Sequence, residues 1–397
     1  MKLLSKLAIA TFFVGTLAAS AQIDAKNNNK VGFKFSNGYS KILFNGKYGF
    51  INKNGDLSIP CIFDYSGDFE NNFSVVRYKD KYGIIAINGL QLVDFDYDYI
   101  ENFNDGLALF KKDGKFGYIN TAGKEVIAAQ FDFATSFSEK IASVEKNGKF
   151  GVINDKGNTI IQAKFDFVGP FKEGIAVVKI NNKFGFINAE GTVIIDATYE
   201  MATSFSNKLA HVKKGNKYGV IDNKNNIVVD FEYASIGKLS DGVAVFEKNG
   251  TYGLINKKGK VIASGYEYLE ESSEGFVSFK RNNLWGMMNT KGKEIAQPTF
   301  QTMGGFSDGL AVVSVNNKYG YINTKGDLQV PIMFDKAGDF SQGLAAVEIR
   351  NTYLYINKKS KEKLEISLND LNHDNITVRN LEANNTHSDT FITKSDL

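Results

Sequence analysis

Residues 175–196 read Ile-Ala-Val-Val-Lys-Ile-Asn-Asn-Lys-Phe-Gly-Phe-Ile-Asn-Ala-Glu-Gly-Thr-Val-Ile-Ile-Asp. Runs rich in β-branched and aromatic residues flank the pair Asn181-Asn182, and a second turn ends at Gly191. Asn and Gly tolerate the positive φ values that tight hairpin turns require. The stretch therefore predicts three short strands joined by two tight turns.

The same phrase recurs along the chain, and each copy is marked by an aromatic residue followed by glycine. Successive glycines lie 34 residues apart, except for one step of 33 between Gly253 and Gly286. A fixed period of this length indicates a repeat architecture, in which each unit buries its apolar face against its neighbours. A degraded tenth copy is Tyr353-Leu354. The repeat-defining pairs, to which we assign a structural role, are Tyr48, Gly49, Tyr82, Gly83, Phe116, Gly117, Phe150, Gly151, Phe184, Gly185, Tyr218, Gly219, Tyr252, Gly253, Trp285, Gly286, Tyr319 and Gly320.

The local signals all favour strands. Only four prolines occur, and no 3.6-residue apolar periodicity is sustained, so we expect no helix outside residues 1–21. Because glycine inside a strand marks close approach, we expect an aromatic ring from the adjacent repeat to lie over Gly49 and its equivalents. Thirty-four residues hold three strands and a short fourth one around residues 165–167.

The predicted fold is all-β, with about ten tandem antiparallel repeats of 34 residues. Two arrangements are open, a superhelical solenoid and a β-propeller-like ring. Because closed rings usually have four to eight blades, about ten units favour the open array.

Composition divides the chain into four parts. Residues 1–21 have the features of a signal peptide: Lys2 and Lys6, an apolar core, and a small-residue cleavage site before Gln22. Residues 22–32 form a short linker, residues 33–367 the repeat array, and residues 368–397 a polar tail that we expect to be disordered. The apolar core of the signal is too short to span a bilayer, which predicts an exported protein, periplasmic or extracellular, without membrane insertion after cleavage.

Charge and cysteine content exclude several classes of partner and site. Removing residues 1–21 takes away two lysines and no acid, which lowers the formal charge from +3 to +1. A near-neutral chain gives no electrostatic case for nucleic acid. Cys61 is the only cysteine, so no intramolecular disulfide is possible, and we interpret it as a small apolar residue.

The sequence contains no recognisable catalytic or metal-binding constellation. The three histidines are His211, His373 and His387, and no two of them stand at ligand spacing. The glycines lie at turn positions and not in a phosphate-binding loop. We therefore predict no catalytic residue, no metal and no cofactor.

One polar feature recurs, a carboxylate framed by aromatic residues. The weak binding candidates are Asp64, Asp98, Asp132, Asp166 and Asp335. Near-equivalents are Glu200, Glu232 and Glu267, whereas Gln301 breaks the rule. A functional interpretation makes them a row for Ca²⁺ or sugar hydroxyls; the structural one, which we favour, makes each an acceptor for backbone N–H groups.

A lysine precedes most of the aromatic-glycine pairs. The lysines are Lys47, Lys81, Lys115, Lys149, Lys183, Lys217 and Lys318. They are placed to pair with the acids across repeats, or, as a row, to contact an anionic glycan.

Residues 114–127, Gly-Lys-Phe-Gly-Tyr-Ile-Asn-Thr-Ala-Gly-Lys-Glu-Val-Ile, together with Leu284-Trp285-Gly286-Met287, resemble the bacterial WG (or KWG) repeat. That family is named for its aromatic-glycine pair, usually with tryptophan, whereas Tyr or Phe stands in most copies here. The resemblance covers roughly residues 33–360 and implies no shared catalytic motif.

Two function classes remain. The first is a non-enzymatic scaffold of the cell envelope or exterior that binds protein or glycan. The second is a carbohydrate-active enzyme that uses two of the repeated carboxylates as acid and base. An enzyme is expected to break its own repeat at the active site, but the most divergent stretch, residues 266–303 around Trp285, substitutes Leu284 and Gln301 and, in our interpretation, adds no acid pair. We favour the first class and predict no enzymatic activity.

Overall fold

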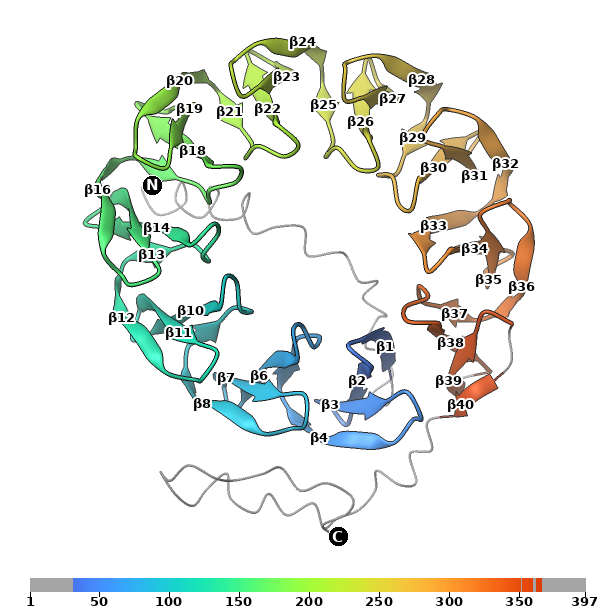
Figure 1. Cartoon of the computed structure of the whole chain (residues 1–397). Helices are drawn as coiled ribbons and strands as arrows, with labels where there is room; N and C mark the ends of the chain where they lie inside the picture. The colour runs from blue at the N-terminus through green and yellow to red at the C-terminus, as the bar shows by residue number, and fades with distance from the viewer. Residues whose placement is uncertain (1–30, 351, 360–361, 366–397) are drawn as a thin grey trace, which may run out of the picture.

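The structure, a computed structural model, describes residues 31–350, 352–359 and 362–365. Every regular element in these residues is a strand and none is a helix, which confirms the all-β prediction. The forty strands form ten antiparallel sheets, each built from four strands that are consecutive in the chain. The sheets stand side by side around a ring (Figure 1), so the fold is a ten-bladed β-propeller.

The first five blades cover residues 31–199. Their strands are β1 (Val31–Ser36), β2 (Tyr39–Phe44), β3 (Lys47–Asn52) and β4 (Leu57–Phe63); β5 (Tyr65–Ser66), β6 (Phe73–Tyr78), β7 (Lys81–Ala86) and β8 (Gln91–Tyr97); β9 (Tyr99–Ile100), β10 (Leu107–Lys112), β11 (Lys115–Asn120) and β12 (Glu125–Phe131); β13 (Phe133–Ala134), β14 (Ile141–Lys146), β15 (Lys149–Asn154) and β16 (Thr159–Phe165); and β17 (Phe167–Val168), β18 (Ile175–Ile180), β19 (Lys183–Asn188) and β20 (Val193–Tyr199).

The last five blades cover residues 201–365. Their strands are β21 (Met201–Ala202), β22 (Leu209–Lys214), β23 (Lys217–Asp222) and β24 (Ile227–Tyr233); β25 (Ser235–Ile236), β26 (Val243–Lys248), β27 (Thr251–Asn256) and β28 (Val261–Tyr266); β29 (Tyr268–Leu269), β30 (Phe276–Arg281), β31 (Leu284–Asn289) and β32 (Glu294–Phe300); β33 (Thr302–Ser307), β34 (Leu310–Val315), β35 (Lys318–Asn323) and β36 (Leu328–Phe334); and β37 (Lys336–Ala337), β38 (Leu344–Ile349), β39 (Thr352–Asn357) and β40 (Glu362–Glu365).

Each blade runs from the inside of the ring to the outside, with strands such as β4, β8 and β12 along the rim (Figure 1). The predicted short fourth strand is present, because β17 follows Asp166 directly. The turn between the second and third strands of a blade, which we call its second turn from here on, has the expected backbone: Asn181 and Asn182 have φ values of 49° and 64°. Asp166 and its equivalents therefore lie on the crossover that leads from the outer strand of one blade to the inner strand of the next.

The ring is closed, and the sequence-based preference for an open array is wrong. The first and last blades meet directly, because Tyr355 on β39 donates to the Phe33 carbonyl oxygen at 2.8 Å and Ser341 donates to the Phe35 carbonyl oxygen at 2.6 Å. The Phe35 and Tyr355 rings also pack edge to face, with centroids 5.1 Å apart. No strand is exchanged between these two blades, so closure rests on side-chain hydrogen bonds and packing between them.

The glycine of the aromatic-glycine pair faces a bulge in the outer strand of its own blade. In the fourth blade Phe150 pairs with Phe165 and Val152 pairs with Ile161, so Gly151 alone opposes three residues of β16. A Cβ atom on Gly151 would lie 2.5 Å from the Ile161 carbonyl oxygen. The expectation that a ring from the adjacent repeat covers this glycine is therefore wrong; the close neighbour is backbone within the same sheet.

The same geometry explains the two irregular copies. In the step of 33 residues, β28 has one residue fewer and bulges by a single residue, Gly265, with φ of 87°. In the last copy, Leu354 replaces the glycine and pairs directly with Glu365, so nothing bulges opposite it. The glycine is kept in every copy whose outer strand bulges opposite it and is lost in the one copy without such a bulge.

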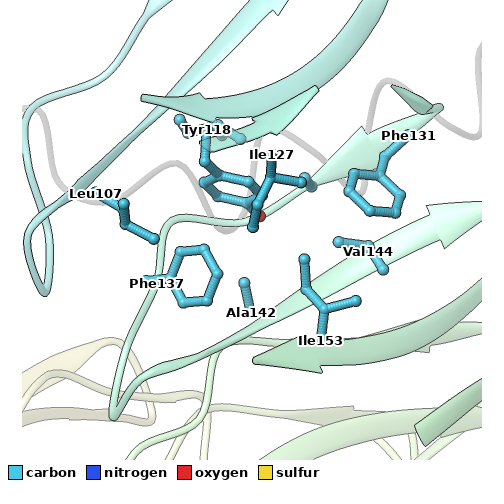
Figure 2. Close-up of a cluster of buried hydrophobic side chains, with 10 residues drawn as sticks. Leu107, Tyr118, Ile127, Phe131, Phe137, Ala142, Val144 and Ile153 are labelled. Carbon is cyan, nitrogen blue, oxygen red and sulfur yellow. The ribbon is translucent and has the colours of Figure 1, made fainter. Parts of the chain in front are cut away.

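The core consists of separate apolar clusters between neighbouring blades. Figure 2 shows the cluster between the third and fourth blades, where Tyr118, Ile127 and Phe131 meet Phe137 and Ile153. The Tyr118 hydroxyl donates to the Thr135 carbonyl oxygen at 2.7 Å, which satisfies its one polar group. Each blade is thus stabilised by two neighbours, as expected for a repeat protein.

The described residues place the first strand slightly earlier than the sequence predicted. Val31 and Gly32 belong to β1, although the sequence assigns them to the linker 22–32. The signal peptide 1–21, the linker up to residue 30 and the polar tail 368–397 lie outside the described residues. No helix in the described part is long and apolar enough to cross a membrane.

Candidate binding face

One side of the ring holds the crossovers between blades together with the second tight turn of every blade; we call it the crossover face. All five candidate aspartates lie there. Asp132 Oδ1 accepts from Lys115 Nζ at 2.5 Å, and Asp132 Oδ2 accepts from the Asn147 backbone N–H at 2.9 Å. Lys115 belongs to the third blade and Asn147 to the fourth. The carboxylate therefore links two adjacent blades.

The other acids repeat this arrangement. Asp166 accepts from Lys149 at 2.6 Å and from the Asn181 N–H at 3.0 Å. Asp335 accepts from Lys318 and from the Arg350 N–H. Asp64 pairs with Lys47, Asp98 with Lys81 and Glu200 with Lys183. The lysine–acid pairing that the sequence suggested is present at these six crossovers.

Three crossovers depart from the pattern in the way that their sequences differ. The crossover from β24 to β25 carries Ala234 and no acid, so the near-equivalence that the sequence assigned to Glu232 is wrong; Glu232 lies on β24 and pairs with Lys248. Glu267 follows the copy in which Thr251 replaces the lysine, and it accepts from the Asn282 and Asn283 N–H groups. Gln301 is not an acid, yet its Oε1 accepts from the Asn317 N–H at 3.2 Å. Glu267 and Gln301 thus both still accept a turn N–H.

The lysines lower the pKa values of the crossover acids. The hydrogen bond from Lys149 holds the pKa of Asp166 below its usual range, and the Asn181 N–H adds to this. The pKa values of Asp64, Asp98, Glu200 and Asp335 are lowered for the same first reason, a hydrogen bond from a lysine. These carboxylates are ionised at neutral pH.

A row of aromatic rings runs along the same face. The residue after the crossover acid packs on the ring of the aromatic-glycine pair: Tyr65 and Tyr82 centroids are 5.9 Å apart, and Tyr82 and Tyr99 centroids are 5.8 Å apart. Tyr82 thereby bridges its own blade and the next. Equivalent contacts join Phe116, Phe133, Phe150 and Phe167.

On the second strand of several blades, a lysine or arginine side chain lies between these rings. Arg77 pairs across the sheet with Tyr65 on one side and Tyr82 on the other. Its guanidinium carbon lies 5.9 Å from the Tyr82 centroid, within the range of a cation–π contact. Lys111 stands in the same way between Tyr99 and Phe116.

The remaining reactive side chains do not form a site. Burial lowers the pKa of His211 on β22, and the backbone N–H of this residue donates to the Thr203 hydroxyl within the same blade. Burial also raises the pKa of the Cys61 thiol to about 12. His373 and His387 lie outside the described residues. In the part that the structure describes, no three His, Cys, Asp or Glu side chains gather closely enough to hold a metal ion.

Sequence reasoning missed a second set of acids, in the first turn of six of the ten blades. Glu139 accepts from the Glu173 and Gly174 N–H groups of the next blade, at 2.6 and 2.8 Å. Asp105, Glu173, Asp241, Glu274 and Asp308 make the equivalent contact. Gln342 extends the series across the closure, since it accepts from the Gly38 N–H at 3.0 Å. The signal that could have found them is their own recurrence at the repeat period.

The sequence-based statement that residues 266–303 add no acid pair is wrong, because Glu270 and Glu271 lie there, beside the inner strand of the eighth blade. Burial raises the pKa of Glu270, and the neighbouring Glu271 raises it further. Glu271 points back toward Gly237 of the preceding blade. No aromatic frame surrounds Glu270 in the sequence, which is why the recurring pattern did not mark it.

The model of the WG-containing repeat matches nine consecutive segments, from residues 48–82 to residues 319–353. The chain belongs to the WG-repeat family. Each WG repeat begins at the third strand of one blade and ends on that strand of the next, so it supplies halves of two blades. Nine such repeats, with β1 and β2 before them and the end of the chain after them, complete the ten blades.

Other comparisons add no function to this WG-repeat protein. No curated protein matches its sequence. A crystal structure of a eukaryotic initiation factor is 11% identical, covers 74% of this chain and 95% of its own, and gives a TM-score of 0.47. PorZ, a bacterial surface component of the type-IX secretion system of Porphyromonas gingivalis, is 9% identical over 85% of this chain and 51% of its own, with a TM-score of 0.29. The extracellular domain of a putative one-component system from B. thetaiotaomicron is 8% identical over 83% and 57%, also at 0.29. We draw no inference from likenesses this weak.

Proposed function

We propose that this WG-repeat protein is a non-enzymatic scaffold, exported to the periplasm or the cell exterior, that binds a protein or a glycan of the envelope. The observation that carries the proposal is the state of the recurring acids. Each has a lysine or a turn N–H as partner, and five have pKa values lowered by a lysine. A glycosidase acid needs the opposite, a carboxyl group whose pKa is raised.

Export is the second part of the proposal, and it rests on residues 1–21 and on the near-neutral charge of the remaining chain. We expect the mature protein to begin at Gln22 and to bind neither nucleic acid nor membrane. Mass spectrometry of the protein expressed with its full sequence, after separation of cytoplasmic and exported fractions, checks this. A protein that starts at Met1 in the cytoplasmic fraction contradicts it.

One observation favours the alternative, a carbohydrate-active enzyme. The raised pKa of Glu270 suits a proton donor, and Glu271 stands next to it. The lowered pKa values of the crossover acids do not suit one, so the enzyme would depend on Glu270 and not on the repeated carboxylates.

The deciding experiment compares capture with turnover. Purified envelope polysaccharide and envelope protein are incubated with the mature protein, with Glu270→Gln and with Asp166→Asn. We expect saturable, reversible capture with no product released, equal in the parent and in Glu270→Gln. If the parent releases shortened glycan and Glu270→Gln does not, the protein is an enzyme and the scaffold proposal is wrong. Absence of capture and of turnover would contradict both.

A further inference from the structure

Three tyrosines stand out on the crossover face because they are the exposed large aromatic side chains of the described residues. Tyr65 is 43% exposed, and Tyr99 and Tyr268 are each 39% exposed. All three occupy the same repeat position, directly after the crossover acid. Equivalent positions hold Phe133 and Phe167, of which Phe167 is only 8% exposed. Exposure is therefore a property of particular blades and not of the repeat.

The exposed tyrosines are held rigidly by other rings. Tyr65, Tyr82 and Tyr99 form one cluster, in the second and third blades. Tyr268 packs against Tyr252 at 5.0 Å and against Trp285 at 5.9 Å, forming a second cluster in the seventh and eighth blades. Rings that are already fixed lose little freedom when a ligand stacks on them. The lone tryptophan of the chain lies in the second cluster.

Around the two clusters the acidic side chains have partners, whereas several cations form no salt bridge. On the first cluster the acids are already partnered: Asp64 with Lys47, Asp98 with Lys81, and Glu101 with the Tyr99 and Ser136 hydroxyls. Among the described residues no salt bridge joins Arg77, Lys111 or Lys280 to a carboxylate, although the charge of Arg77 contributes to the lowered pKa of Asp64. Arg77 and Lys111 flank the first cluster, and Lys280 pairs across the sheet with Tyr268 and Trp285 in the second. The Arg77 Nε is buried and makes no hydrogen bond within the described residues.

We propose that the two clusters bind a polysaccharide that carries carboxylate or phosphate groups. Its sugar rings stack on Tyr65, Tyr99 and Tyr268, and its acidic groups pair with Arg77, Lys111 and Lys280. Tyrosine suits such a ligand because its ring is apolar and its hydroxyl bonds to sugar hydroxyls. Arginine suits the acidic groups because its guanidinium binds a carboxylate or phosphate through two N–H donors.

A polysaccharide fits this face better than a protein partner does. The rings are interrupted by the lysine–acid pairs of the crossovers, so they form no continuous apolar patch of the kind that protein interfaces bury at their centre. The two clusters are five blades apart in a ring of ten blades (Figure 1). A long polymer with repeated acidic groups can occupy both, which increases the overall affinity without a further contact.

This inference rests on the proposed function and narrows it to one ligand class. The test measures binding to a set of carboxylate- and phosphate-bearing polysaccharides, with polygalacturonate and its methyl ester as a matched charged and uncharged pair. We expect the parent to bind at least one acidic polymer and to prefer polygalacturonate over its ester. Tyr99→Ala and Tyr268→Ala should each weaken binding about tenfold, as loss of a central aromatic anchor does. The double variant should lose more than either alone.

Two further variants separate stacking from charge and from general damage. Arg77→Gln should reduce the preference for the unesterified polymer. Ile227→Ala removes a side chain that is 57% exposed on β24 at the rim, away from both clusters, and should bind as the parent does. Melting temperatures confirm that each variant is folded.

Three results would overturn the inference. In the first, the parent binds no acidic polysaccharide. In the second, it binds polygalacturonate and its ester equally well. In the third, the double tyrosine variant binds as well as the parent. Capture of an envelope protein with no acidic polysaccharide bound would leave the scaffold proposal standing and remove this ligand class. Failure of both captures would remove the scaffold proposal as well.

Discussion

At the scale of single residues, Gly151 has backbone on the side where a Cβ atom would point. The Ile161 carbonyl oxygen would lie 2.5 Å from that atom and the Ala163 nitrogen 2.8 Å from it. Both belong to the bulge of β16, which cannot move without breaking its pairing with β15. The glycine of the aromatic-glycine pair is thus explained by a steric requirement inside one sheet.

We therefore expect Gly151→Ala to lower the free energy of unfolding by about 1–3 kcal/mol, the usual cost of overpacking. Gly148→Asn is the matched control, because Gly148 has φ of 75° with nothing within 4 Å of a Cβ atom. Asparagine tolerates that conformation, so the control should cost less than about 1 kcal/mol. Chemical denaturation of both variants measures the difference. Equal costs would contradict the steric account.

Asp166 carries the second prediction at this scale. Its carboxylate accepts from Lys149 of one blade and from the Asn181 N–H of the next. Asp166→Ala should cost about 0.5–1.5 kcal/mol, since the pair is partly exposed and solvent screens it. Asp132→Ala should cost about the same, and the two effects should nearly add.

The same variants decide between a structural and a metal-binding row. Melts of the parent and of Asp132→Ala are recorded with Ca²⁺ and with a chelator. We expect no difference between the two conditions in either protein. A calcium-dependent rise of the parent melting temperature that is lost in Asp132→Ala would make the row a binding site.

At the scale of elements, neighbouring blades are joined by apolar clusters and by two sets of carboxylates. The crossover acids join blades on one face, and the first-turn acids, such as Glu139, join them through backbone N–H groups of the following turn. The crossover acids form their ion pairs with lysine only when they are ionised. The blade interfaces are therefore expected to weaken in acid.

The sign of the pH dependence follows from the lowered pKa values. Asp64, Asp98, Asp166, Glu200 and Asp335 bind protons less readily in the folded chain than in the unfolded one. Their contribution is fully present above the unfolded pKa of about 4, and it is lost as the pH falls through the lower folded values. His211, whose folded pKa is also lowered, begins to reduce stability near pH 6.5.

Melting temperatures recorded between pH 7 and pH 2.5 test this prediction. The parent should lose stability most steeply below about pH 4. Lys115→Gln with Lys149→Gln should flatten that part of the curve, because these lysines pair with Asp132 and Asp166. A double variant whose curve runs parallel to that of the parent would show that the pairs contribute nothing.

Local elements were predictable from the sequence where local chemistry determines them. The Asn181-Asn182 turn, the strands that flank it and the lysine–acid spacing could all be found from residue types at a fixed period. The environment of Gly151 was misjudged, because a bulge in a partner strand leaves no mark on the glycine's own segment. The first-turn acids recur at the repeat period, but they are absent from several blades and have no flanking aromatic residues to draw attention to them.

At the scale of the whole molecule, closure joins two segments that lie far apart in the chain. Tyr355 and Phe33 are 322 residues apart and share a hydrogen bond. Ser40 lies 2.7 Å from the same tyrosine hydroxyl, and Phe35, Ile42, Ile51 and Leu344 complete the cluster. Nothing in a repeat of 34 residues determines how far each unit turns relative to the last. The sequence therefore left ring and solenoid open.

The most direct test of the account measures whether the first and last blades are neighbours. Spin labels are placed at Asn54 and Lys359, which occupy the same exposed turn position in these two blades, with Cys61→Ala in the background. The reference pair is Lys156 and Glu190, the same position in the adjacent fourth and fifth blades. Double electron–electron resonance spectroscopy measures the distance between the two labels of each pair. A closed ring predicts that the two pairs give matching distance distributions. A much longer distance between Asn54 and Lys359 than between the reference pair would contradict the ring.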